Sequence, residues 1–291
     1  MSNFSEKERK PVNVNSFMKF KKQNHKITML TAYDYSTAKM LDEAGVDGIL
    51  VGDSLAMVAL GYEDTMKITT EEMLIFTKAV ARGVKSSFVV ADMPFMSYHV
   101  SVEEGIKNAG EFIRAGAKAV KIEGGSDYTA QLTKRLTESG IPVLAHLGFT
   151  PQFINSLGGH YIQGKSAENT KRILEEARKM ECAGAFAVVL EMVPEESAKY
   201  ITENISIPTI GIGAGRFCSG QILVTDDIIG KYSDFTPKFV KKYADVFTVI
   251  KSAASEYVND VHTGSFPEEN HVFKLDETEG KKLYDFTDKN N

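Results

Sequence analysis

Residues 114–122 read RAGAKAVKI, and the same pattern returns as EAGVDGILV at residues 43–51 and as CAGAFAVVL at residues 182–190. In each segment an Ala-Gly pair ends a helical stretch, and a short apolar run follows almost at once. Glycine is a frequent helix stop, and a nearly all-apolar run is typical of a parallel strand covered on both faces. The three segments therefore predict repeated units in which a helix is followed by a buried strand.

Eight strands of this kind can be traced along the chain. They are Ile27–Tyr33, Gly48–Ser54, Phe88–Pro94, Ala119–Gly124, Pro142–Gly148, Ala185–Val193, Ile207–Gly213 and Gln221–Val224. The segments Ser36–Glu43, Thr70–Arg82, Val102–Arg114, Tyr128–Glu138, Ala167–Ala183 and Pro194–Glu203 have helical patterns. Eight βα units predict an α/β protein of the (β/α)8 TIM-barrel class, which needs roughly 250 residues. An open doubly wound sheet is the alternative architecture.

Three stretches lie outside the repeats. Residues 1–26 are expected to form an N-terminal extension, in which the amphipathic segment Val14–Phe20 is a helix that caps the bottom of the barrel. Residues 27–258 are expected to hold a single barrel domain with a terminal helix over residues 237–258. Residues 259–291 are expected to be a C-terminal segment whose end, from about residue 273, is a loose charged tail.

Composition excludes several classes of protein. Apolar residues make up 43% of the chain, charged residues 25%, and the net charge is -5, whereas a nucleic-acid binder needs a basic stripe. No apolar run approaches the roughly 18 residues that cross a membrane, and the N-terminus lacks the apolar core of a signal peptide. Two cysteines cannot build a disulfide framework. We therefore expect a cytoplasmic protein that binds neither nucleic acid nor membrane.

Ionisable side chains stand where the apolar strands stop. They are Asp53, Asp92, Lys121, Glu123, His146 and Glu191. A buried carboxylate is costly unless it is paired, hydrogen-bonded or bound to a cation, and for Asp53 alone helix capping is an equally good explanation. Several carboxylates on one rim repel one another, and a hard divalent cation with oxygen ligands relieves that repulsion. The sequence thus predicts a magnesium site shared by Asp53 and Asp92, and it disfavours zinc because only one histidine is well placed.

The remaining strand-end residues suggest roles in binding and proton transfer. Lys121 and Glu123 are two positions apart on one strand, so both can point into the barrel mouth. A structural ion pair is the alternative for these two, as a satisfied core histidine is for His146. In a functional role, Lys121 would bind an anionic group of the substrate and His146 would donate a hydrogen bond to it. Glu191 ends the most apolar strand, where burial should raise its pKa and suit it as a general base.

These residues also carry a resemblance to a known family. The segments TAYDYSTAKMLDEAGVDGILVGDSLAMV, ADMPFMSY, AGAKAVKIEGG, PVLAHLGFTPQ, GGHYIQGK, VLEMVP and IPTIGIGAG resemble, in order and spacing, the ketopantoate hydroxymethyltransferase family. The resemblance runs from about residue 12 to about residue 272.

The resemblance implies a magnesium-dependent barrel enzyme of pantothenate and coenzyme A biosynthesis. Such an enzyme transfers a hydroxymethyl group from the co-substrate 5,10-methylenetetrahydrofolate to 3-methyl-2-oxobutanoate, giving 2-dehydropantoate through a magnesium-stabilised enolate. Large homo-oligomers, often decamers, are also implied. The matched positions are Asp53, Asp92 and Glu123 at the metal; Asp53, Ser54, Asp92, Lys121 and His146 at the keto acid; and Glu191 as the proton acceptor.

Two other functions compete with this interpretation. One is a metal-dependent lyase or mutase of the phosphoenolpyruvate mutase and isocitrate lyase group, which uses a similar barrel. Members of that group commonly carry a catalytic cysteine in a Lys-Lys-Cys-Gly-His loop, and the sequence has no such motif. The other is a non-catalytic barrel that only binds a ligand or assembles.

Overall fold

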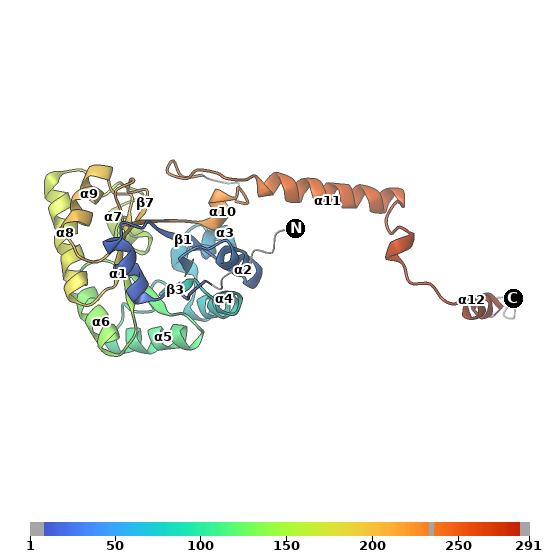
Figure 1. Cartoon of the computed structure of the whole chain (residues 1–291), viewed down its shortest axis with the longest axis horizontal. Helices are drawn as coiled ribbons and strands as arrows, with labels where there is room; N and C mark the ends of the chain where they lie inside the picture. Colours follow the sequence, from blue (N-terminus) through green and yellow to red (C-terminus); the bar gives the residue numbers. More distant parts are fainter. Residues whose placement is uncertain (1–8, 233–235, 286–291) are drawn as a thin grey trace. The chain divides into compact units, whose positions relative to one another are not determined.

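The computed structural model describes residues 9–232 and 236–285. Its centre is a closed barrel of parallel strands in sequential order, which confirms the predicted (β/α)8 class (Figure 1). The strands are β1 Ile27–Thr31, β2 Gly48–Val51, β3 Phe88–Asp92, β4 Ala119–Glu123, β5 Val143–Gly148, β6 Ala187–Glu191, β7 Thr209–Ile212 and β8 Gly220–Leu223. Seven of the observed strands are shorter than predicted, at one end or at both, and β8 is shifted by one residue.

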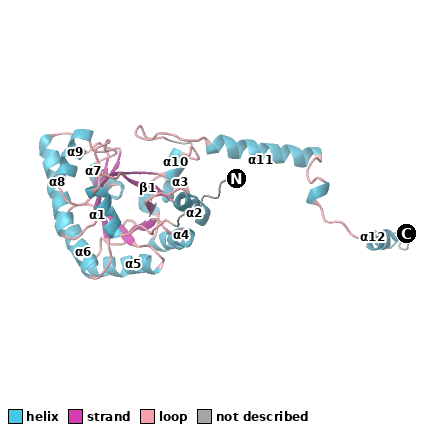
Figure 2. Cartoon of the chain, viewed as in Figure 1, coloured by secondary structure: helices cyan, strands magenta, loops and turns pink. Residues whose placement is uncertain are grey.

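Helices surround the strands, as Figure 2 shows by colour. The long ones are α1 Val14–Lys22, α2 Tyr35–Glu43, α4 Thr70–Gly83, α5 Val102–Arg114, α6 Asp127–Glu138, α8 Ala167–Cys182 and α9 Glu195–Glu203. Short turns of helix follow several strands: α3 Leu55–Val58, η1 Thr65–Lys67, η2 Pro151–Phe153, α7 Ile154–Leu157 and α10 Thr225–Ile228. The start of α4 shows why these boundaries arise, since Thr69 and Glu72 form a reciprocal capping box.

The apolar core has two layers, one between the sheet and the helices and one inside the barrel. The inner layer contains Met29, Leu50, Val90, Leu144 and Val189, which lie on the inward faces of five strands. The strands close on one another tightly where β8 meets β1. A side chain at Gly220 would stand 2.5 Å from the carbonyl oxygen of Ile27, so only glycine allows this pairing.

Helix α1 closes the bottom of the barrel, as predicted for the N-terminal segment. Phe17 is fully buried there. Its ring meets Phe88 edge-on at 5.4 Å and Phe186 at 5.2 Å, and both partners stand at the amino ends of strands. Because the bottom is filled with aromatic rings, only the opposite end of the barrel is left for polar chemistry.

Replacing Phe17 with leucine should destabilise the protein without changing its chemistry. The smaller side chain leaves a cavity and loses two edge-on ring contacts, so we expect a loss of about 2 kcal/mol in the free energy of unfolding. Urea denaturation followed by circular dichroism measures this. The partly buried Met18, on the same helix, is the control position. An equal loss of stability in Met18→Leu would show that the ring contacts of Phe17 contribute no more than ordinary apolar packing.

The chain divides into two compact units, Met1–Tyr243 and Ala244–Asn291. The second contains α11 Val246–Thr263, η3 Glu269–His271 and α12 Glu277–Asp285. The terminal helix predicted over residues 237–258 was placed too early, because the Asp245 side chain caps it at Thr248 and glycine ends it at position 264. It lies in the second unit, so the barrel unit ends earlier than the expected boundary at residue 258.

The predicted loose tail is also corrected in part, since residues 277–285 form helix α12. The ends of the two expected terminal segments, residues 1–8 and 286–291, lie outside the described residues. None of the helices in the described ranges is long and apolar enough to cross a membrane.

Candidate active site

The polar site is a continuation of the inward faces of the strands. Side chains two positions apart on a strand point the same way, and the inward apolar residues near the bottom are followed by polar ones near the top. In this way Val90 leads to Asp92, Ala119 to Lys121 and Glu123, Leu144 to His146, and Val189 to Glu191. The parallel register brings these positions to one end of the barrel, because all the strands run in the same direction.

The acidic cluster begins with Asp53 and Asp92, which lie beyond β2 and at the end of β3. Both are buried, with 4% and 2% of their surface exposed. The backbone N–H of Asp53 donates to Asp92 Oδ2 at 3.0 Å. Burial and the charge of Asp92 raise the pKa of Asp53 well above its ordinary value. The pair therefore holds more negative charge than its surroundings neutralise.

Lys121 lies between two of the carboxylates. Its ammonium group forms a hydrogen-bonded ion pair with Asp92 and lies 3.9 Å from Glu123 Oε1. Burial alone would lower the pKa of Lys121, but the charges of Asp92, Asp53 and Glu123 outweigh burial and raise it. The lysine is therefore a fixed positive charge in the barrel mouth.

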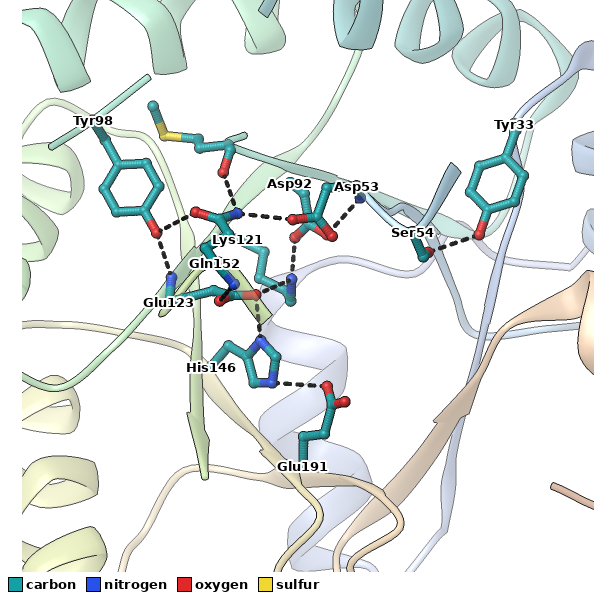
Figure 3. Close-up of polar contacts among 11 residues, drawn as sticks. Tyr33, Asp53, Ser54, Asp92, Tyr98, Lys121, Glu123, His146, Gln152 and Glu191 are labelled. Atoms are coloured by element: carbon teal, nitrogen blue, oxygen red, sulfur yellow. Dashed lines mark hydrogen bonds and ion pairs between the residues drawn. The ribbon is translucent and has the colours of Figure 1, made fainter. Parts of the chain in front are cut away.

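A second line of contacts runs from Glu123 through His146 to Glu191 (Figure 3). His146 Nδ1 lies 3.1 Å from Glu123 Oε1, and His146 Nε2 lies 3.1 Å from Glu191 Oε2. Burial would lower the pKa of His146, but Glu123 and Glu191 raise it to about 9. Burial would likewise raise the pKa of Glu123, but His146 and Lys121 lower it. At neutral pH Glu123 is therefore a carboxylate and His146 an imidazolium.

Glu191 is held at the rim by its backbone. The φ angle of Gly148 is 93°, and a side chain there would stand 2.3 Å from the carbonyl oxygen of Glu191. The next residue, Met192, also has a positive φ, of 49°. Such strain in a non-glycine residue is concentrated at functional sites. The Glu191 side chain is 16% exposed, so it is more open than its apolar strand suggested.

Ser54 takes a different direction from the acidic cluster. Its hydroxyl lies 2.8 Å from the hydroxyl of Tyr33, which follows β1. The structure therefore joins Asp53, Asp92, Lys121, Glu123, His146 and Glu191 into one network and places Ser54 beside it, toward β1 (Figure 3).

Two further residues complete the network and were missed in the sequence. The Gln152 side chain donates to Asp53 Oδ2 at 2.9 Å, and its backbone N–H donates to Glu123 Oε2 at 2.9 Å. The Tyr98 hydroxyl donates to Gln152 Oε1 at 3.0 Å and accepts from the backbone N–H of Glu123. Both lie within segments quoted for the family resemblance, but neither is charged or ends a strand, so the strand-end argument passed over them.

Tyr98→Phe should weaken this network from one end. The change leaves the backbone N–H of Glu123 and Gln152 Oε1 without the hydroxyl, at a cost of about 1–3 kcal/mol in the free energy of unfolding. Thermal unfolding and the turnover rate both measure the effect. Tyr62→Phe, on the exposed loop before η1, is the control; equal stability of Tyr98→Phe and the wild type would mean that water replaces the hydroxyl.

The arrangement is not a closed cage for a metal. Among the residues that the structure describes, no three acidic, histidine or cysteine side chains are arranged to surround an ion. Glu123, which the resemblance places at the metal, contacts Gln152, Lys121 and His146. Asp53 and Asp92 are the carboxylates whose excess charge suits a cation.

Comparison with known proteins identifies the family. A sequence model of ketopantoate hydroxymethyltransferase matches residues 11–269. The chain belongs to the ketopantoate hydroxymethyltransferase family. A 3-methyl-2-oxobutanoate hydroxymethyltransferase of Clostridium novyi (strain NT) is 54% identical over 272 residues, covering 93% of this chain and 98% of the relative. That of Clostridium beijerinckii is 52% identical over 270 residues, covering 92% and 98%. The enzyme is thus a one-carbon transferase.

Solved structures of other enzymes share the fold of this hydroxymethyltransferase. A phosphoenolpyruvate phosphomutase from Streptomyces platensis subsp. rosaceus aligns over 96% of this chain and 98% of its own, with a TM-score of 0.57 and 14% identity. At that identity the likeness shows the barrel architecture alone. The lyase and mutase alternative therefore gains no support beyond the fold, whereas the family relatives share half of the sequence.

Proposed function

We propose that this enzyme transfers a hydroxymethyl group from 5,10-methylenetetrahydrofolate to 3-methyl-2-oxobutanoate, giving 2-dehydropantoate for pantothenate synthesis. The observation that carries the proposal is the convergence of a buried lysine, a buried acidic pair and Glu191 in one barrel mouth. A 2-keto acid needs those parts: a cation for its carboxylate, a way to stabilise charge on the ketone oxygen, and a base for the proton at C3.

The residues around Asp53 fit a magnesium ion. Magnesium prefers oxygen ligands and usually takes one or two protein carboxylates together with water and substrate oxygens, so Asp53 and Asp92 suffice without a closed cage. Burial and the charge of Asp92 raise the pKa of Asp53, and a bound cation would favour its ionised form. When bound, magnesium would supply Lewis-acid stabilisation of negative charge on the ketone oxygen. Glu123 would act near the ion by holding Lys121 and His146.

The chain's own residues perform the proton transfer. Lys121 would bind the keto-acid carboxylate, with Ser54 beside it. Glu191 would take the proton from C3, so that the electron pair of the broken C–H bond moves toward the ketone oxygen. His146 Nε2 lies 3.1 Å from Glu191 Oε2 and would hold the Glu191 side chain in position for this step. Water would release the donor's methylene carbon as formaldehyde, which breaks its bonds to N5 and N10 and frees tetrahydrofolate. C3 then bonds to that carbon, and its oxygen takes the proton back from Glu191 to become the new hydroxyl group.

The test is product formation from 3-methyl-2-oxobutanoate and methylenetetrahydrofolate, with magnesium and with a chelator. We expect 2-dehydropantoate with magnesium and its loss with chelator. A folded sample that yields no product under either condition would reject the transferase proposal, and product that survives the chelator would reject the metal.

We also propose that the enzyme is a cytoplasmic homo-oligomer, a decamer as the family resemblance implies. Helix α11 supports assembly because none of its residues is buried within the chain. Phe247, Val249, Ile250, Tyr257 and Val258 on that helix are each at least 45% exposed, and exposed apolar surface of this extent marks interaction sites. Light scattering coupled to gel filtration gives the mass; a monomer at micromolar concentration would reject the assembly.

A further inference from the structure

One sector of the barrel mouth has no part in the chemistry described so far. The reacting groups come from β2 to β6, whereas β7, β8 and β1 form the remaining rim, and α10 follows β8 there. Thr225, the first residue of α10, ties the two strands together. Its hydroxyl donates to the carbonyl of Thr31 at 2.5 Å, and its backbone N–H donates to Thr31 Oγ1 at 3.1 Å. Helix α10 is therefore fixed to the end of β1.

Two neighbouring carboxylates on α10 differ sharply in their partners. Asp226 and Asp227 are both more than nine-tenths buried, with 5% and 8% exposed. Asp226 Oδ1 pairs with Lys231 at 2.9 Å. The carboxylate of Asp227 has neither a hydrogen-bond donor nor an ion pair within residues 9–232 and 236–285. Burial and the charge of Asp226 raise the pKa of Asp227 to about 6, and the charge of Lys242 offsets only part of this.

A carboxylate buried without donors lowers stability. Its backbone carbonyl accepts from Gly230, but no described residue donates to its carboxylate, so its position suggests a ligand that brings N–H groups to it. The sector lies next to the reacting groups. The charges of Asp226 and Asp227 add to burial in raising the pKa of Tyr33, and the Tyr33 hydroxyl contacts Ser54, the neighbour of Asp53 (Figure 3). Asp227 therefore lies close enough for its charge to act on Tyr33, which contacts the keto-acid site through Ser54.

We propose that Asp227 binds the pterin ring of the one-carbon donor. The pyrimidine edge of a reduced pterin carries two adjacent donors, the ring N3–H and the 2-amino group. A carboxylate is an acceptor with two oxygens and can receive both at once. This inference rests on the proposed function, because that function makes the donor a folate. It assigns the β8 and β1 sector to the folate and leaves β2 to β6 to the keto acid.

Asp227→Asn separates folate binding from the keto-acid chemistry. An amide offers one acceptor and one clashing NH2, so we expect the KM for methylenetetrahydrofolate to rise about 10- to 100-fold, the usual range for losing a hydrogen bond to a charged group. Exchange of the C3 proton of 3-methyl-2-oxobutanoate with deuterium, measured without folate, should stay unchanged. Asp127→Asn is the matched control, since this exposed carboxylate pairs with Lys179 at the start of α6.

A second probe leaves the protein unaltered. A donor analogue without the 2-amino group should bind the wild-type enzyme about as weakly as the natural donor binds Asp227→Asn. The affinity of this analogue should fall little further when the enzyme is Asp227→Asn. An unchanged folate KM in Asp227→Asn, or slowed C3 exchange with that KM unchanged, would overturn the inference. If Asp227→Asn does not fold, the wild type alone decides the matter. Equal binding of the natural donor and of the analogue without the 2-amino group would then overturn the inference. Failure of the proposed function is distinct, because the wild type would then form no product.

Discussion

Glu191→Gln is expected to slow exchange of the C3 proton of 3-methyl-2-oxobutanoate by about 10²- to 10⁴-fold, the usual contribution of a positioned general base. The amide has nearly the same shape but cannot accept the proton. Magnesium binding should be preserved, because the Glu191 side chain contacts His146 and not the Asp53 and Asp92 pair. Proton NMR in deuterium oxide follows the exchange, and isothermal titration follows the metal.

The control for this substitution is Glu203→Gln. Glu203 is an exposed carboxylate of α9 that pairs with Lys199 on the same helix. The Glu203→Gln variant should exchange the C3 proton of the substrate at the wild-type rate. Full exchange by Glu191→Gln would mean that another group is the base.

Lys121→Met should produce the largest change in stability. Breaking a buried ion pair leaves uncompensated charge and costs about 3–5 kcal/mol, and here the Asp92 and Glu123 carboxylates both lose their cation. We expect a loss of that size in the free energy of unfolding, measured by urea denaturation in the presence of a chelator. Magnesium should restore part of it, because a divalent cation supplies the missing positive charge.

The pH dependence of Lys121→Met gives an independent check. Without the lysine, the folded-state pKa values of the buried carboxylates rise above those of the unfolded chain. Stability is then lost as pH rises through the folded pKa and regained as pH falls, because protonation removes the repulsion. The defect should therefore be larger at pH 8 than at pH 5. Lys179→Met removes an exposed partner of Asp127 and should change little; an equal defect at both pH values would argue that lost packing is the cause.

Much of the site could be predicted because it follows from strand geometry. An apolar strand whose last inward position is charged must bring that charge to the barrel mouth, and this logic found Asp92, Lys121, Glu123, His146 and Glu191. The same logic found the barrel, because all-apolar strands separated by helices need cover on both faces. The prediction of helix α1 succeeded for a similar reason, since one apolar face marked it as a cap.

Other features depend on contacts between distant parts of the chain. Gln152 stands in the turn η2 after β5, yet its side chain donates to Asp53 beyond β2, 99 positions away. Its partner Tyr98 comes from the loop before α5. The difference between Asp226 and Asp227 is likewise invisible in the sequence, because adjacent aspartates look alike until one of them meets Lys231.

The sequence by itself determined the repeated βα units, the strand ends that carry the chemistry, and the charged residues gathered there, because a period of two along each strand decides which side chains share a face. Only the tertiary structure decided how those charges are paired. Closing the barrel sets Lys121 between Asp92 and Glu123, puts His146 between two carboxylates, and leaves Asp227 with no donor in the described chain. Pairing depends on distances across the barrel, which no local pattern along the chain contains.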